Sequence, residues 1–134
     1  MADAPNRSDL ELLKAAQQAR DVAYAPYSGF KVGAAVRTRS GNLYTGCNVE
    51  NASFGLSICA ERVAVFKAAA AGDTDIVELA VFTDAEPPSQ PCGACRQVLF
   101  EFGRDLKVIL GNGRGVVLFS DIHTLFPQPF ELRG

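Results

Sequence analysis

Three cysteines and one glutamate are the residues of this chain whose types and spacing best fit catalytic chemistry. Cys92 and Cys95 are separated by two residues and directly follow Pro91. If they begin a helix, this spacing brings both sulfurs to one side of its first turn, where they can bind one metal ion. Cys59 opens a second predicted helix, with Glu61 two residues later. Because two helix N-termini aimed at one ion would stabilise thiolates, the sequence predicts one zinc ion held by three cysteines.

The number of ligands indicates a catalytic rather than a structural zinc. Three protein ligands leave one tetrahedral position open for water, whose pKa falls from about 16 to near 7 at favourable zinc sites. Three thiolates donate charge to the ion and weaken this effect, so a nearby base has to help. We expect Glu61 to take the proton from that water and to deliver it to the substrate.

Other interpretations of the cysteines remain open at this point. A Cys-x-x-Cys motif alone is also compatible with a redox pair or a structural zinc knuckle. A non-catalytic, zinc-stabilised binding module would need a fourth ligand, for which only Cys47 and His123 remain. We expect Cys47 to be a small buried residue in a strand and His123 to be a surface or capping histidine.

The hydrophobic pattern predicts the elements that must position these residues. Helices are expected from near Asp9, behind a Ser8/Glu11 capping box, over residues 59–71 and 93–102, and shortly after Asp121. Strands are expected over residues 30–38, 43–47, 76–83, 107–110 and 116–119. This order favours an α/β fold, a three-layer α/β/α sandwich with a mixed five-stranded sheet whose first two strands form an antiparallel hairpin. No linker or composition shift divides the 134 residues, so we expect a single catalytic domain over residues 1–134.

Composition and charge argue against several classes of partner. The net charge is −2 and the basic residues are scattered, whereas nucleic-acid binding normally needs a basic face. The apolar runs are too short to cross a bilayer, and residues 1–8 lack the pattern of a secretory signal. We therefore expect a cytoplasmic protein with reduced thiols, a small-molecule substrate, and neither a nucleic-acid nor a membrane partner.

The residues around the cysteines resemble a known family. Two stretches match the signature of zinc-dependent deaminases with three cysteine ligands, namely Cys59-Ala60-Glu61-Arg62 and Pro91-Cys92-Gly93-Ala94-Cys95-Arg96-Gln97. Residues 23–28, 30–35 and 46–52 resemble the family's first loop, first strand and nucleoside-binding stretch. Over roughly residues 10–130, the chain resembles the small homotetrameric cytidine deaminases of the cytidine/deoxycytidylate deaminase family.

This resemblance implies a reaction and a division of roles. The reaction is hydrolytic deamination of cytidine and deoxycytidine to uridine and deoxyuridine plus ammonia, a step of pyrimidine salvage. Cys59, Cys92 and Cys95 would bind one Zn²⁺ per subunit, and Glu61 would move the protons. Substrate contacts would come from Phe30, Asn48, Glu50, Phe54, Ala60 and Phe130.

The resemblance also suggests how these contacts work. The amide of Asn48 and the carboxylate of Glu50 would bracket the 3′-hydroxyl with a donor and an acceptor, although by themselves the two residues fit a solvated loop. Phe30 would flank the pyrimidine ring, although a phenylalanine at a strand start is more often a core residue. Phe54 and Phe130 would reach a neighbouring subunit's pocket in a homotetramer with shared active sites. Relatives commonly have tyrosine at position 54, so a hydroxyl contact is expected to be missing here.

Two further residues are expected beside the sulfurs. Arg62, and with it Gln97, would support the ligands, because a guanidinium offsets the net negative charge of zinc, three thiolates and hydroxide. A surface position is the alternative for Arg62. A related enzyme acting on a nucleotide, on a base in nucleic acid or on an aminated antibiotic nucleoside is the competing function. Cysteine as first ligand, and a carboxylate at Glu50 where a phosphate would be repelled, argue against it.

Overall fold

A five-stranded mixed sheet forms the centre of the structure, a computed structural model that describes residues 4–132. The strand order is β2-β1-β3-β4-β5, and only β3 and β4 run parallel. The strands are β1 (Gly33–Thr38), β2 (Leu43–Cys47), β3 (Ile76–Thr83), β4 (Lys107–Asn112) and β5 (Val117–Asp121). The helices are α1 (Arg7–Arg20), α2 (Ala60–Ala70), α3 (Gly93–Phe102) and α4 (Ile122–Leu125), with a short 3₁₀ turn, η1 (Phe54–Leu56). No helix among the described residues is both long and apolar enough to span a membrane.

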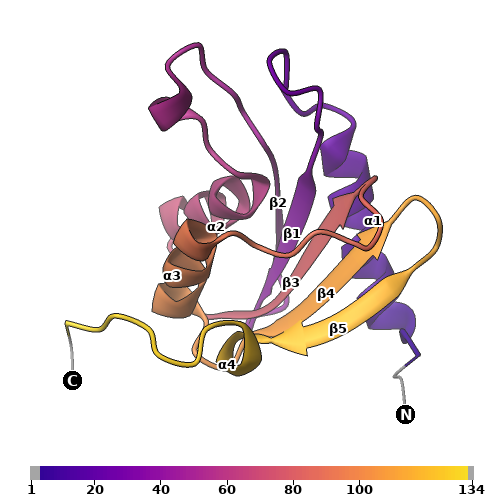
Figure 1. Cartoon of the computed structure of the whole chain (residues 1–134). Coiled ribbons are helices and arrows are strands. Elements are labelled where there is room, and N and C mark those ends of the chain that lie inside the picture. Colours follow the sequence, from indigo (N-terminus) through magenta and orange to yellow (C-terminus); the bar gives the residue numbers. More distant parts are fainter. Residues whose placement is uncertain (1–3, 133–134) are drawn as a thin grey trace.

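Helices cover both faces of the sheet and make three layers (Figure 1). Successive residues of β1 point to opposite faces, as the strand period requires. Ala35 belongs to the apolar cluster under α1, whereas Ala34 and Val36 belong to the larger cluster under α2 and α3. This arrangement confirms the predicted α/β sandwich with a mixed five-stranded sheet.

Two glycines let the helices approach the sheet closely, Gly46 in the edge strand β2 and Gly33 in its neighbour β1. A Cβ atom at Gly46 of β2 would lie 2.5 Å from the backbone nitrogen of Ala64 and 2.6 Å from the carbonyl oxygen of Ala60. A Cβ atom at Gly33 would overlap the carbonyl oxygen of Ala16 in the same way, at 1.8 Å. The absence of a side chain at Gly46 thus sets the distance between β2 and the first turns of α2, where the predicted site lies.

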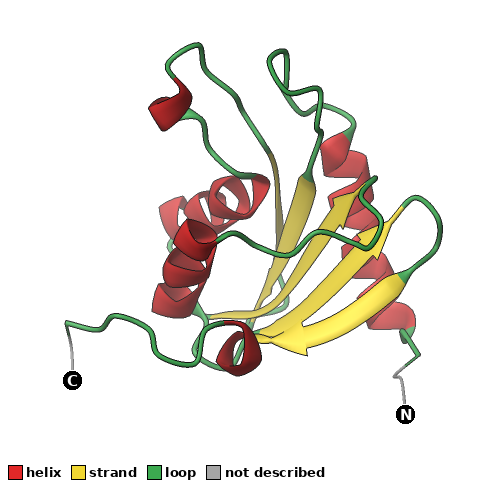
Figure 2. Ribbon diagram, viewed as in Figure 1, coloured by secondary structure: helices red, strands yellow, loops and turns green. Residues whose placement is uncertain are grey.

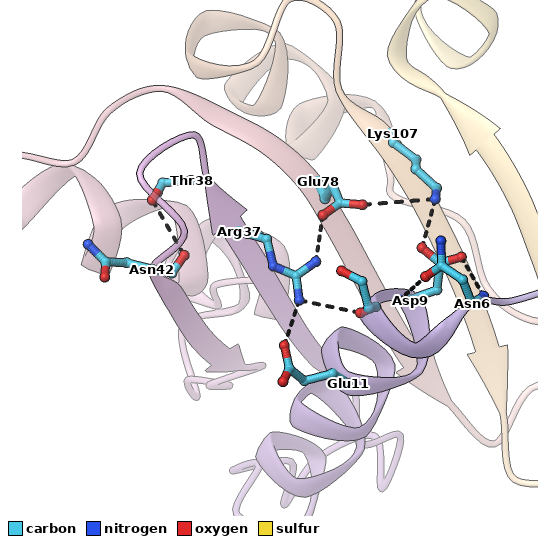
Figure 3. Close-up of polar contacts among 9 residues, drawn as sticks. Asn6, Asp9, Glu11, Arg37, Thr38, Asn42, Glu78 and Lys107 are labelled. Carbon is cyan, nitrogen blue, oxygen red and sulfur yellow. Dashed lines mark hydrogen bonds and ion pairs between the residues drawn. The ribbon is translucent and has the colours of Figure 1, made fainter.

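A polar network at the start of α1 fixes that helix to the sheet (Figure 3). Asn6 caps the helix, and its side chain and that of Asp9 bond each other's backbone N–H groups. The predicted Ser8/Glu11 capping box is therefore wrong. Asp9 also accepts a bond of 2.7 Å from Lys107 of β4. The side chain that completes the capping box therefore also connects α1 to the sheet.

Every predicted helix and strand is present, but several bounds differ: β4 and β5 end two residues later than the predicted 107–110 and 116–119, and α2 is one residue shorter at each end than 59–71. The strands over residues 43–47 and 76–83 and the helix over 93–102 agree with the prediction, and Asp121 caps α4. The strand expected from Phe30 begins only at Gly33, because residues 30–32 bond the side chain of Asn48 instead of a neighbouring strand. The 3₁₀ turn η1 was not predicted.

Candidate metal centre and active site

The N-terminal ends of two neighbouring helices carry the three cysteines. Cys59 is the N-cap of α2 and Cys92 the N-cap of α3, and Cys95 lies in the first turn of α3. Neither N-cap sulfur accepts a capping hydrogen bond from a backbone N–H of its own helix. The two helices pack against each other on one face of the sheet (Figure 1). The amide groups and dipoles of both helix starts therefore favour negative charge at the sulfurs.

The three sulfurs form a cluster that fits a zinc ion. All three lie within 4.8 Å of one another, and the Sγ atoms of Cys59 and Cys92 are 3.9 Å apart. Tetrahedral zinc with Zn–S bonds of about 2.3 Å needs sulfurs about 3.8 Å apart. Within residues 4–132 no other cysteine, histidine or carboxylate joins this cluster. A bound zinc would therefore keep one position open, which disfavours the four-ligand structural site.

The two residues considered as fourth ligands lie elsewhere. The ring of His123 is paired with Asp105 at 2.9 Å and is largely exposed, as expected for a surface histidine. Cys47 is a free, half-buried cysteine at the end of β2, close to its predicted setting.

Arg62 lies beside the sulfurs, as predicted. Its Nη2 donates to the Sγ of Cys59 at 3.6 Å, and its buried Nε has no hydrogen-bond partner within residues 4–132. A hydrogen bond from the Cys95 thiol lowers the pKa of Cys59 to about 5, with burial opposing the shift and Arg62 adding to it. The pKa of Cys95 is raised because its thiol bonds the Cys59 thiolate and is buried. Negative charge therefore develops first on Cys59, next to the guanidinium.

Glu61 is a buried carboxyl group two residues after Cys59. It lies in the first turn of α2, is only 5% exposed and does not belong to the sulfur cluster. Burial, reinforced by the charge of Cys59, raises its pKa to about 7. A carboxyl group with this pKa exchanges a proton easily near neutral pH, which is the property required of a general acid and base.

A cavity of about 320 Å³ is lined by Cys59, Cys92 and Glu61, with Cys95 buried behind its wall. This volume is within the range of about 300–1,000 Å³ that is usual for small-molecule sites. Figure 2 shows the two long loops over residues 21–32 and 48–59 projecting beyond the same end of the sheet, beside the start of α2. The cavity brings together these predicted residues: Phe30, Asn48, Glu50, Cys59, Ala60, Glu61 and Cys92.

Asn48 and Glu50 line this cavity, and they also hold one of its loops. The amide of Asn48 accepts from the backbone N–H of Val32 and donates to the carbonyl of Phe30, both at 2.8 Å. Glu50 accepts from the backbone N–H groups of Tyr27 and Ser28 at 3.0 and 3.1 Å, and from the Ser28 hydroxyl. Each side chain still has bonding capacity for a ligand, because an amide nitrogen carries two hydrogens and a carboxylate has about four acceptor positions.

Two predicted substrate-binding residues, Phe54 and Phe130, lie outside the cavity of this chain. Phe54 is 75% exposed and contacts the ring of Tyr27 edge-on, with centroids 6.0 Å apart. Phe130 is 68% exposed in the C-terminal segment. The structure differs from the expectation for Gln97, whose amide bonds the backbone N–H and carbonyl of Phe130 rather than the cysteines.

Several residues that line the cavity were not predicted. Ser28, Ser57, Ser89 and Gln90 all contribute to the cavity wall. Ser89 and Gln90 directly precede the Pro91-Cys92 pair, so their proximity in sequence to a ligand was a usable signal. Ser57 offered no such signal, because its position depends on how the loop before α2 folds.

Comparison with known proteins agrees with this geometry. The family described as the cytidine and deoxycytidylate deaminase zinc-binding region matches residues 6–112. The chain belongs to this family. The matched range includes all three cysteines, Glu61 and every residue that lines the cavity.

Individual relatives cover almost the whole chain. A cytidine deaminase of Halalkalibacterium halodurans is 49% identical over 120 residues, which are 89% of this chain and 91% of that protein. A cytidine deaminase of Sporosarcina psychrophila is 43% identical over 90% of each chain. The crystal structure of a cytidine deaminase from Burkholderia pseudomallei has a TM-score of 0.87 and 49% identity, covering 90% of this chain and 98% of its own.

Proposed function

We propose that this protein is a zinc-dependent hydrolase that converts cytidine and deoxycytidine to uridine and deoxyuridine with release of ammonia, a step of pyrimidine salvage. The observation that carries this proposal is the buried Glu61 beside a three-sulfur cluster in one cavity. The relatives that match most of the chain are named cytidine deaminases, which supports the choice of substrate.

The proposed mechanism assigns one proton-transfer role to Glu61. Zinc bound by Cys59, Cys92 and Cys95 would supply a water molecule of lowered pKa. Glu61 accepts a proton as the water oxygen attacks C4 of the cytosine ring, and it passes protons to the adjacent ring nitrogen and to the departing amine. Its pKa of about 7 suits both directions of transfer, because neither its acid nor its base form is strongly disfavoured at neutral pH.

The substrate would enter with its ribose between the two long loops. We assign Asn48 and Glu50 to the 3′-hydroxyl, with the capacity that remains beyond their bonds to the backbone of residues 27–32. Phe30 is proposed to flank the pyrimidine, and Ala60 to form the wall between Cys59 and Glu61. Arg62 is assigned to stabilising the Cys59 thiolate.

We further propose a homotetramer in which sites are shared between subunits. The exposed rings of Phe54 and Phe130 support this assembly, because both lie outside the cavity of their own chain. Light scattering should give four times the chain mass of 14.3 kDa. A stable monomer with full activity would contradict the shared site.

The whole chain, residues 1–134, is assigned to one catalytic domain that acts in the cytoplasm. Two apolar clusters on the faces of a single sheet support one domain. Four free cysteines support a reducing compartment, where thiolates stay available to the metal.

A panel of substrates tests the proposal. The purified zinc-loaded protein is assayed for ammonia release from cytidine, deoxycytidine, dCMP, adenosine, guanine and blasticidin S. We expect turnover of the two cytosine nucleosides and little reaction with the others. Preference for dCMP or for blasticidin S would overturn the assignment of Glu50 and the cavity to an unmodified nucleoside.

A further inference from the structure

Arg96 makes three hydrogen bonds that join separate parts of the molecule. It follows Cys95 in α3 and is half-buried. Its Nε donates to the carbonyl of Pro91 at 2.8 Å, its Nη1 to the carbonyl of Leu125 at 2.6 Å, and its Nη2 to the Oε1 of Gln90 at 3.3 Å. Each of the three guanidinium nitrogens thus reaches a neutral oxygen, so these contacts depend on the shape of the group as well as on its charge.

Two of these acceptors belong to the loop that carries a metal ligand. Pro91 immediately precedes Cys92, and its carbonyl lies just outside the helix, because the first helical bond runs from the Arg96 N–H to the Cys92 carbonyl. The side chain of Gln90 is part of the cavity wall. Residues 84–91 contain no helix or strand. This loop therefore lacks the regular backbone hydrogen bonds of the helix that contains Cys95.

The third acceptor, the carbonyl of Leu125, belongs to the C-terminal segment, residues 125–131. Leu125 is the last residue of α4. Two other side chains also hold this segment, since Gln97 of α3 bonds the backbone of Phe130 and Arg104, in the turn after α3, pairs with Glu131 at 2.5 Å. Of these three side chains, Arg96 is the one that also bonds the cysteine loop.

The three cysteines differ in how firmly the fold holds them. Cys95 is buried inside α3 and Cys59 is half-buried, whereas Cys92 is exposed. An exposed ligand at a loop–helix junction receives little support from side-chain packing. Its sulfur position therefore depends on the backbone just before it, which is the backbone that Arg96 bonds.

We propose that Arg96 is a positioning residue that fixes the Cys92 sulfur, by tying the Pro91 carbonyl and the Gln90 side chain to the C-terminal segment. This role rests on the proposed zinc function. A lysine at this position would keep the charge but provides one ammonium group, which cannot reproduce three bonds in a fixed fork. Groups that orient metal ligands typically affect metal affinity by about 10–100-fold.

Arg96→Lys and Arg96→Gln test the proposal, with Arg104→Lys and Arg104→Gln as matched controls, because Arg104 also holds the C-terminal segment but, within residues 4–132, makes no bond to the cysteine loop. The zinc-loaded proteins are mixed with a chromophoric chelator, and the rate of zinc release is followed. We expect release to be about 10–100-fold faster in both Arg96 variants. The Arg104 variants should stay within about twofold of wild type, as for surface substitutions in general.

Cobalt substitution gives a second readout that overall stability does not determine. The thiolate-to-cobalt charge-transfer and d–d bands of the Co²⁺-loaded protein should shift in the Arg96 variants and stay unchanged in the Arg104 variants. Wild-type zinc release and wild-type cobalt bands in both Arg96 variants would overturn the proposal. Loss of the far-ultraviolet circular dichroism in both would also overturn it, since Arg96 would then support the whole fold rather than one ligand.

These readouts separate this proposal from the proposed function. Neither measurement requires turnover of cytidine. A wild-type protein that holds zinc tightly but deaminates nothing would end the proposed function and leave the positioning role of Arg96 intact. The converse result, full deaminase activity with wild-type zinc release in Arg96→Gln, would end only the positioning role.

Discussion

The metal centre and the substrate loops are built by different means. The cysteines occupy the starts of two helices, so local helix geometry and packing place their sulfurs. The loops over residues 21–32 and 48–59 have little regular structure, and side chains of one loop bond the backbone of the other. Asn48 therefore shapes the cavity in addition to the ribose contact proposed for it, whereas Glu61 has only the proposed role in proton transfer.

The largest effect is expected at Glu61, the residue assigned to proton transfer. Glu61→Gln should lower kcat for cytidine by about 10³–10⁴-fold, because the amide cannot carry the proton. Zinc content should remain that of wild type, since Glu61 lies outside the sulfur cluster. The measurement is the loss of cytidine absorbance together with metal analysis, with Glu11→Gln on the exposed side of α1 as control. Loss of zinc in Glu61→Gln would place the carboxylate among the ligands instead.

A substitution at Gly46, where β2 packs against α2, tests how the sheet positions the metal centre. Gly46→Ala should push this helix away from β2, because the new Cβ would lie 2.5 Å from the Ala64 nitrogen. We expect about 2–3 kcal/mol of lost stability in urea unfolding, with reduced zinc content. Gly55→Ala is the matched control, because a Cβ there meets nothing within 4 Å. Equal stability of the two variants would mean that the close approach of α2 is unimportant.

The substrate loops are tested at Asn48. Asn48→Ala removes two bonds to the backbone of Phe30 and Val32, as well as the proposed ribose contact. At about 1 kcal/mol per bond, kcat/KM for cytidine should fall about 10–100-fold. Zinc content should not change, which distinguishes this region from the metal centre. Asn42→Ala, in the distant β1–β2 turn, serves as control and should keep its activity. A normal kcat/KM in Asn48→Ala would show that Asn48 neither shapes the cavity nor binds the ribose.

The smallest effect is expected outside both regions, at the start of α1. Burial raises the pKa of Asp9, but the hydrogen bond from Lys107 and the bond to Asn6 outweigh it, so the pKa is lowered overall. A lowered pKa in the folded state stabilises the protein above about pH 4, and this contribution disappears as the pH falls through the folded-state value. Asp9→Ala should cost about 1–2 kcal/mol at pH 7, because the Asn6 N–H and Lys107 lose their bonds to the carboxylate, and it should flatten this pH dependence. Calorimetry at pH 3 to 7 checks it, and cytidine turnover at 25 °C should be unaffected.

The same contrast explains what the sequence could predict. The period of the apolar residues sufficed for β3 and α3, and the spacing of Cys92 and Cys95 sufficed for their shared cluster. These features depend on neighbours within a few residues along the chain. The resemblance placed Arg62 correctly at Cys59.

Contacts between distant residues were beyond such reasoning. Nothing near Gln97 in the sequence shows that its amide bonds Phe130, which is 33 residues away. The bonds from Asn48 to residues 30–32 likewise depend on how two loops meet, and they shorten the strand expected there. Asn6 replaced Ser8 as helix cap because the carboxylate of Asp9 serves the cap and Lys107 of β4 at once.

We propose that the deamination of cytidine requires both zinc bound by the three cysteines and proton transfer by Glu61. The most direct measurement follows cytidine absorbance with the wild-type protein as isolated, after removal of zinc by a chelator, and after one equivalent of Zn²⁺ is returned. We predict turnover that is lost on chelation and recovered on return of zinc in the wild type, with no recovery in Glu61→Gln. Undiminished turnover by the zinc-free protein, or full recovery in Glu61→Gln, would contradict the account.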